Sequence, residues 1–207
     1  MFEVREKPQM VENALLVGVY LDKAEALEAE SLLEELRDLV ETLNIGIAKT
    51  RLIKVRERYP SHLMGKGKMA EVIDEAGHSG CDCIIFDNEL SPRQQRNWEH
   101  EANLLVIDRQ EVILDIFAMR AQTKEARLQV QLARMQYALP RMARMWGHLD
   151  RQGGGSGGGK GGAGAARGEG EKQIEIDRRL ANKRIEKLKS ELATVRKQRA
   201  TQRKDRM

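Results

Sequence analysis

The feature that most constrains the fold is the alternation, in the first half of the chain, of strand-like runs with segments of helical periodicity. Short runs that favour strands lie at residues 14–20, 45–55, 83–86 and 104–107. Apolar residues three and four apart, which favour helices, lie between these runs at residues 24–43 and 69–76, and a further helix is expected to begin at Pro92. Such alternation predicts a parallel sheet with right-handed crossovers. We therefore expect an α/β fold, a small parallel four-stranded sheet with flanking helices, in residues 1–108.

Two of the expected helices begin at residues that suit a helix N-terminus. Asp22 directly precedes the first helix, and aspartate is a preferred N-cap. Ser91 and Pro92 open a later helix, with serine as the cap and proline at the first helical position. These positions predict where the two helices start.

The second half of the chain changes to a heptad-like pattern. One apolar stripe, with spacings of 4, 3, 4, 3 and 4, consists of Leu128, Leu132, Met135, Leu139, Met142 and Trp146, and it continues upstream in the same phase through Leu114, Phe117 and Ala121. A second stripe, spaced 4, 3, 4 and 3, consists of Ala181, Ile185, Leu188, Leu192 and Val195. Such stripes are typical of the buried faces of paired helices, and Pro140 should bend or break the first helix. The pattern predicts a long antiparallel α-helical hairpin in residues 109–207.

A glycine-rich loop, at about residues 151–172, is expected to join the two helices. The segment Gly153–Gly170 contains 11 of the chain's 18 glycines, together with Lys160 and Arg167. We expect such a segment to be flexible when free. A passive linker is one interpretation, but antiparallel helices need only a few residues to turn. A basic, glycine-rich tip suits a narrow, negatively charged space better, because glycine lets the backbone approach phosphates closely.

Charge is divided unequally along the chain. Residues 1–119 contain 14 Lys/Arg and 23 Asp/Glu, a balance of −9, whereas residues 120–207 contain 22 and 9, a balance of +13. The net charge of +4 hides this asymmetry. It indicates that only the second half meets a polyanion. The alternative is a solvated helix that is simply rich in arginine.

We predict no catalytic, nucleotide-binding or metal-binding residue in this chain. The run Gly154–Gly161 nearly fits the P-loop pattern, but Gly161 has no hydroxyl for Mg²⁺ and the run follows a helix instead of a strand. No nucleophile and base stand in a suitable arrangement, and the four histidines are scattered singly. Cys81 and Cys83 lie in an apolar run without a partner pair at zinc-finger spacing, which favours buried free thiols in a reducing compartment.

The first ten residues do not resemble a signal peptide, because they are charged and contain Pro8. No apolar run approaches the roughly 20 residues that a membrane span needs. These observations predict a cytoplasmic protein without a membrane span.

Five segments together resemble the HflX family of ribosome-associated GTPases. Residues 86–99, FDNELSPRQQRNWE, are similar to the family's DxELSPxQxRNLE stretch, with Trp98 in place of the usual leucine. The others are Gly65–Lys68 (GKGK), Val106–Arg141, residues 151–155 (RQGGG) and residues 167–179 (RGEGEKQIEIDRR). They cover nearly the whole chain from about Ala14, in the family's order.

The resemblance implies the N-terminal region of such a GTPase, with the G domain missing. Proteins of this family bind the large ribosomal subunit and split or rescue stalled ribosomes, and GTP and Mg²⁺ belong to the G domain. Their N-terminal region binds rRNA, and the loop between the long helices reaches toward the peptidyl-transferase centre. The chain as it stands would be non-catalytic and hold no cofactor. It departs from the family at Gly168–Lys172, where Gly-Pro-Gly-Glu-Thr is usual, and its glycine-rich insert is longer.

Charge and resemblance together predict the rRNA contacts. At the tip, these are Arg151, Lys160 and Arg167, with the backbone of Gly153, Gly154 and Gly155; along the adjacent helix ends, they are Arg141, Arg144, Arg178, Arg179, Lys183 and Arg184. Two other hypotheses remain open: a coiled-coil interaction scaffold without RNA binding, and a GTPase whose catalytic domain was lost or left out. An intramolecular hairpin predicts a monomer, whereas a coiled-coil scaffold would dimerise.

Overall fold

The computed structural model describes residues 11–141 and 163–204. The chain divides into two compact units, residues 1–116 and residues 117–207. The sequence places the start of the second domain at residue 109, whereas this division falls inside a helix that begins there. Each unit is described by itself.

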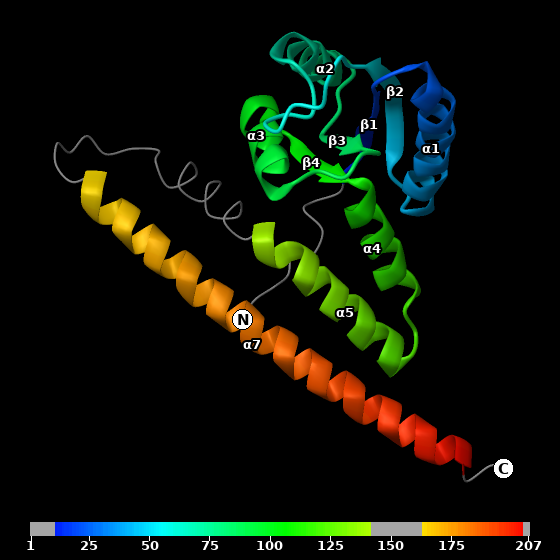
Figure 1. The fold of residues 1–207 in the computed structure, drawn as a ribbon, viewed down its shortest axis with the longest axis vertical. Coiled ribbons are helices and arrows are strands. Elements are labelled where there is room, and N and C mark those ends of the chain that lie inside the picture. Colours follow the sequence, from blue (N-terminus) through cyan, green and yellow to red (C-terminus); the bar gives the residue numbers. More distant parts are fainter. Residues whose placement is uncertain (1–10, 142–162, 205–207) are drawn as a thin grey trace. The chain divides into compact units, whose positions relative to one another are not determined.

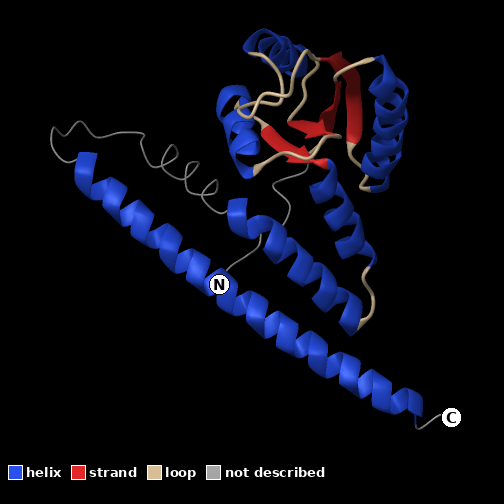
Figure 2. Ribbon diagram, viewed as in Figure 1, coloured by secondary structure: helices blue, strands red, loops and turns tan. Residues whose placement is uncertain are grey.

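The first unit contains a four-stranded sheet whose strands are all parallel (Figures 1 and 2). In chain order the strands are β1 (Asn13–Tyr20), β2 (Gly46–Lys54), β3 (Cys83–Phe86) and β4 (Leu105–Asp108). Their order in the sheet is β2-β1-β3-β4. The predicted α/β fold with a small parallel four-stranded sheet is therefore confirmed, and each strand lies within one or two residues of its predicted range.

Helices cover both faces of this sheet, as a parallel sheet requires. One face of β1, with Leu15 and Val17, packs in the same core as α2 (Lys66–His78) and α3 (Pro92–Ala102). The other face, with Leu16, packs in the same core as α1 (Lys23–Thr42) and the start of α4 (Arg109–Arg120). Successive residues of a strand point to opposite faces, so the uninterrupted apolar run of β1 fills both cores.

The helix starts follow the capping residues in the sequence. Asp22 is the N-cap of α1, and its side chain accepts hydrogen bonds from the backbone of Ala24 and Glu25. Ser91 is the N-cap of α3 and forms a capping box with Gln94, with Pro92 in the first turn. Both predicted starts are confirmed.

The second unit consists of α5 (Lys124–Ala138), the short 3₁₀ helix η1 (Leu139–Arg141) and α7 (Ala163–Lys204), together with the end of α4. Pro140 ends α5, as the sequence predicts. The stripe from Leu114 predicted one continuous helix. That prediction is wrong, because α4 and α5 are separate helices. Thr123 caps α5 by accepting a hydrogen bond from the backbone of Ala126, which starts a new helix.

Helices α5 and α7 lie side by side and run in opposite directions (Figure 1). Glu125, at the start of α5, pairs with Arg196 and Arg199, near the end of α7. The core between them contains the buried residues Leu128, Leu188, Leu192 and Val195, with Leu132 and Met135 packed against it. The two predicted stripes thus meet, although Met142, Trp146 and the tip of the hairpin lie outside the described residues.

The start of α7 differs from the expected loop boundary. The glycine-rich loop was expected to extend to about residue 172, whereas α7 begins at Ala163 and includes Gly164, Gly168 and Gly170. The helix formed by the residues after these glycines extends back through them. The helix propensity of glycine is low, but it does not prevent this.

Candidate nucleic-acid interface

A groove between η1 and α7 collects several of the predicted RNA-binding side chains. One wall is formed by Leu139 and Pro140 of η1. The opposite wall, on α7, consists of Glu175, Ile176, Arg178, Arg179, Asn182, Lys183 and Glu186. Residues three or four apart on a helix share one face, which is why Glu175, Arg179, Asn182 and Glu186 line the same wall.

The cations in and next to this groove have no acidic partners among the described residues. Arg178, Arg179, Lys183 and Arg184 are exposed, and none pairs with a described carboxylate. Farther along the helix the pattern changes. Lys187 pairs with Glu191 at 3.9 Å and Lys189 pairs with Glu186 at 2.8 Å. The unpaired positive charge of the described part of α7 is therefore greatest beside the groove.

Arg141 has a different environment from the cations on α7. Its guanidinium carbon lies 3.7 Å from the centre of the Tyr137 ring, and its Nη1 donates a hydrogen bond of 3.2 Å to the Tyr137 carbonyl. This cation–π contact holds the side chain against the end of α5 while leaving its charge intact.

The structure brings together Arg178, Arg179 and Lys183 in one groove, with Arg184 exposed on the same helix outside it. The predicted contacts at Arg144, Arg151, Gly153, Gly154, Gly155 and Lys160 lie outside the described residues. Arg167 belongs to α7, but its side chain also lies outside the described part.

The sequence did not reveal the apolar wall of the groove or Asn182. The sequence pattern placed Leu139 in the core between the helices. Pro140, which ends α5, was the signal that Leu139 would lie outside that helix. Asn182 lies in a polar stretch of α7 and gives no signal of its own in the sequence.

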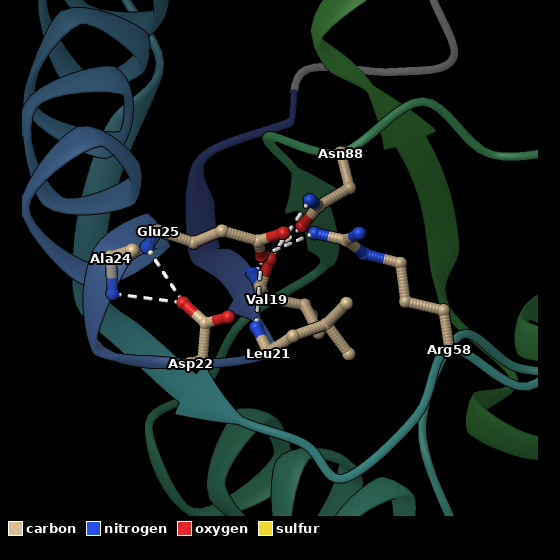
Figure 3. Close-up of polar contacts among 7 residues, drawn as sticks. All are labelled: Val19, Leu21, Asp22, Ala24, Glu25, Arg58 and Asn88. Carbon is tan, nitrogen blue, oxygen red and sulfur yellow. Dashed lines mark hydrogen bonds and ion pairs between the residues drawn. The ribbon is translucent and has the colours of Figure 1, made fainter.

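The carboxyl end of the sheet is a second place to consider, because open α/β sheets bind ligands where the strand order reverses. Here that point lies between β1 and β3. Figure 3 shows that the chain's own carboxylates occupy the start of α1. Asp22 accepts from the amides of Ala24 and Glu25 at 2.8 and 3.1 Å, and Glu25 accepts from the amide of Leu21 at 2.9 Å and from Arg58 at 2.8 Å. Three backbone amides at this helix start, those of Leu21, Ala24 and Glu25, are thus bonded to the chain's own carboxylates and not open to an anionic ligand.

Asn88 joins β1 and β3 at this edge of the sheet. It follows β3, and its side chain accepts a hydrogen bond from the Val19 amide at 2.7 Å and donates one to the Val19 carbonyl at 3.0 Å (Figure 3). The neighbouring Asp87 pairs with Arg109 at 2.9 Å, and Arg109 also pairs with Glu35 at 2.6 Å. This end of the sheet is thus a hydrogen-bonded junction between β1, β3, α1 and α4.

The two cysteines of the first unit lie in its core. Cys81 and Cys83 are buried and free, as the sequence predicts. Burial raises the pKa of both thiols, of Cys83 strongly, so both stay protonated at neutral pH. Within residues 11–141 and 163–204, acidic, cysteine and histidine side chains form no group of three or more that could hold a metal ion. The same part of the chain has no helix long and apolar enough to cross a membrane.

Comparison with known proteins assigns the two halves of the chain. Residues 30–118 match the family model described as the GTP-binding GTPase N-terminal region, and residues 120–206 match the model of the GTP-binding GTPase middle region. The border between the two matches lies close to the border between the two units. Relatives named GTPase HflX align along the whole chain.

The chain belongs to the HflX family.

The family members that it resembles come from diverse bacteria. GTPase HflX of Akkermansia muciniphila is 65% identical over 206 residues, which cover 100% of this chain and 47% of that protein. GTPase HflX of Chlamydia pneumoniae is 43% identical, covering 98% of this chain and 42% of that protein. GTPase HflX of Escherichia coli is 38% identical, covering 95% and 43%. The chain therefore spans about half the length of the curated HflX relatives that it matches.

Two solved structures share the fold. A structure described as that of SsGBP in complex with GDP has a TM-score of 0.60 at 22% identity and covers 93% of this chain and 46% of that chain. A GTP-binding protein from the archaeon Sulfolobus solfataricus, also in complex with GDP, has a TM-score of 0.54 at 21% identity, covering 89% and 46%. At this level of identity, the similarity shows a shared fold alone.

Proposed function

We propose that this chain is a ribosome-binding region, in which the groove face of α7 contacts rRNA of the large subunit. The observation that carries the proposal is the set of exposed cations beside the groove, Arg178, Arg179, Lys183 and Arg184, without acidic partners among the described residues. Phosphate binding by such cations releases counterions, which favours association with any dense array of phosphates. A ribosomal partner also implies a cytoplasmic location.

Membership of the HflX family supports the choice of the ribosome over other polyanions, since family members act in ribosome splitting and rescue. The sheet unit would serve as a scaffold in this function, because its ligand-binding edge is closed by its own side chains. The tip residues Arg151, Gly153, Gly154, Gly155, Lys160 and Arg167, and Arg144, would add contacts nearer the peptidyl-transferase centre.

The test is binding to purified large subunits across a salt series. In the triple variant Arg178→Gln, Arg179→Gln, Lys183→Gln, we expect weaker binding and a shallower dependence of log K on log salt. The slope should fall by roughly 0.7 to 0.9 for each phosphate contact that is lost. A matched control, Lys124→Gln, Lys187→Gln, Lys197→Gln, removes the same charge from the same unit at positions that do not line the groove. Equal effects of the two variants, or binding that is insensitive to salt, would contradict the proposal.

We further propose that neither the described groove nor the sheet edge is a GTP-binding site, and that GTP and Mg²⁺ belong to a G domain of the kind found in full-length relatives. Titration of this chain with a fluorescent GTP analogue should give no saturable signal. Saturable binding that GDP competes away would place a nucleotide site in this chain and overturn that part of the proposal.

The coiled-coil scaffold is the second candidate function. The packing of α5 on α7 argues against it, because Leu128, Leu188, Leu192 and Val195 are already buried within one chain. The proposal therefore includes a monomeric state. Sedimentation equilibrium would distinguish the two candidates, since a scaffold would form dimers whose proportion rises with concentration.

A further inference from the structure

We infer that the groove between η1 and α7 accepts an unpaired RNA nucleotide, with the base against the apolar wall and the phosphates on the flanking cations. This inference rests on the proposed function and specifies the form of RNA that the same face selects. It goes beyond phosphate contact, because base contact requires a nucleotide that is not stacked in a helix.

The apolar surface of the groove is the first observation that points to a base. Leu139 is half-buried and Pro140 is exposed, both on η1. Facing them on α7, Ile176 leaves 42% of its surface exposed. Phosphate binding alone gives no reason for exposed apolar side chains between cations. A nucleobase, with its flat apolar face, is a suitable occupant of such a surface.

The polar groups along the α7 wall complement the edge of a base. The Asn182 side chain can both donate and accept hydrogen bonds, and it lies between Arg179 and Glu186 on the same face of the helix. The carboxylates of Glu175 and Glu186 can accept hydrogen bonds from base amino groups. Glu186 also pairs with Lys189 at 2.8 Å, which reduces its repulsion of a nearby phosphate.

The cations complete the site from its sides. Arg178 and Lys183 flank the row of Glu175, Arg179, Asn182 and Glu186, so positive charge borders a wall that offers both hydrogen-bond donors and acceptors. This order places phosphates at the rim and the base at the centre. A duplex would present only phosphates and sugars to the rim, because its bases are paired and stacked.

The chain offers a matched pair of variants for the test. Ile176 lines the groove and is 42% exposed, whereas Leu180, one turn away on α7, is 41% exposed and does not line it. Replacing either by serine removes a similar exposed apolar surface from the same helix. Circular dichroism melts of Ile176→Ser and Leu180→Ser should therefore be close to each other, and a loss of RNA binding cannot be assigned to unfolding.

Binding is measured by fluorescence anisotropy with labelled single-stranded and fully paired RNA that have equal numbers of phosphates. We expect the unmodified chain to bind the single strand more tightly than the duplex. Ile176→Ser should weaken single-strand binding by about tenfold, the effect of losing one base contact, and leave duplex binding unchanged. Leu180→Ser should change neither affinity.

Equal affinity for the two RNAs, or equal effects of the two serine variants, would overturn the inference. A concentration-dependent dimer that Ile176→Ser dissociates, with no change in RNA affinity, would assign the groove to a second copy of the chain and also overturn it. In both cases the proposal of ribosome binding stands if the triple glutamine variant still weakens binding to large subunits, but a dimer would contradict the proposed monomeric state. If the unmodified chain does not bind large subunits at all, the proposed function itself fails.

Discussion

At the scale of single residues, Asn88 shows how one side chain can decide what a sheet edge does. Its side chain takes the place of a neighbouring strand for Val19: it accepts a hydrogen bond from the backbone N–H of Val19 and donates one to the Val19 carbonyl. The sequence marks Asn88 as part of a family-like motif, but nothing in the motif reveals that its partner lies 69 residues earlier. A side chain in this position excludes an external ligand and ties β3 to β1.

We expect Asn88→Ala to destabilise the sheet unit by about 1–3 kcal/mol, because it leaves two partly buried backbone groups of Val19 without their partner. Urea unfolding followed by hydrogen exchange in β1 and β3 measures this change. Glu89→Ala, at the exposed neighbouring position, is the control and should have little effect. Equal stabilities of the two variants would show that the Asn88 bonds contribute nothing.

Glu125 makes the pairing of α5 with α7 dependent on pH. The hydrogen bond from Arg199, with a second from Arg196, lowers the pKa of Glu125. A carboxylate whose pKa is lower in the folded state stabilises the fold above its unfolded pKa, and this contribution is lost as the pH falls through the folded pKa. The ion pair therefore strengthens the helical unit at neutral pH and not in acid.

Thermal melts of the unmodified chain and of Glu125→Gln test this dependence. The unmodified chain should melt higher at neutral pH, and the difference should vanish once the pH lies well below the ordinary glutamate pKa of about 4.3. Glu191→Gln, which removes an exposed pair with Lys187, is the control. If the melting temperatures of the unmodified chain and of Glu125→Gln still differ in acid, the effect does not come from the charge of Glu125.

At the scale of elements, the contact between α5 and α7 depends on few side chains. Leu188 is the most deeply buried residue of the core between them, with 1% of its surface exposed. Most of the described surface of α7 is polar or charged. Its packing on α5 therefore depends on the apolar stripe that contains Leu188, Leu192 and Val195.

We expect Leu188→Ala to cost about 2–5 kcal/mol, from lost burial and from the cavity that remains. Leu180→Ala, at a position that is 41% exposed on the same helix, should cost far less. Hydrogen exchange along α5 and α7 measures both effects, because opening of this contact exposes the backbone amides of both helices. Similar exchange rates in the two variants would mean that the stripe does not hold the helices together.

The break between α4 and α5 is another property of an element that a stripe alone does not determine. Leu114, Phe117 and Ala121 keep the phase of the later stripe, yet Phe117 is 57% exposed. Thr123 ends the continuity because its hydroxyl bonds the Ala126 amide in a cap. Capping competes locally with helix propagation, and here it outweighs the periodicity.

At the scale of the whole molecule, the division of charge coincides with the division into units. The sheet unit, residues 1–116, contains 14 Lys/Arg and 23 Asp/Glu, whereas residues 117–207 contain 22 and 9. A single polyanionic partner would attract the second unit and repel the first. The two units can thus have separate tasks, scaffold and contact surface.

We expect large subunits to protect amides of the second unit from hydrogen exchange, above all around η1 and the groove face of α7. The outer face of the acidic helix α1 should exchange at the same rate with and without subunits. The full chain is compared in both states, with a salt concentration that abolishes binding as the control. Protection centred on α1 would contradict the assignment of the contact surface to the second unit.

The sequence by itself determined the parallel α/β unit, the capped helix starts, the end of α5 at Pro140 and the basic character of α7, because each depends on local periodicity, capping or composition. Only the tertiary structure decided that Asn88 and Glu25 close the sheet edge, that α4 and α5 are separate, and that Arg178, Arg179 and Lys183 share a groove with Leu139 and Pro140. These features depend on which distant residues meet, and local patterns carry no information about such pairings.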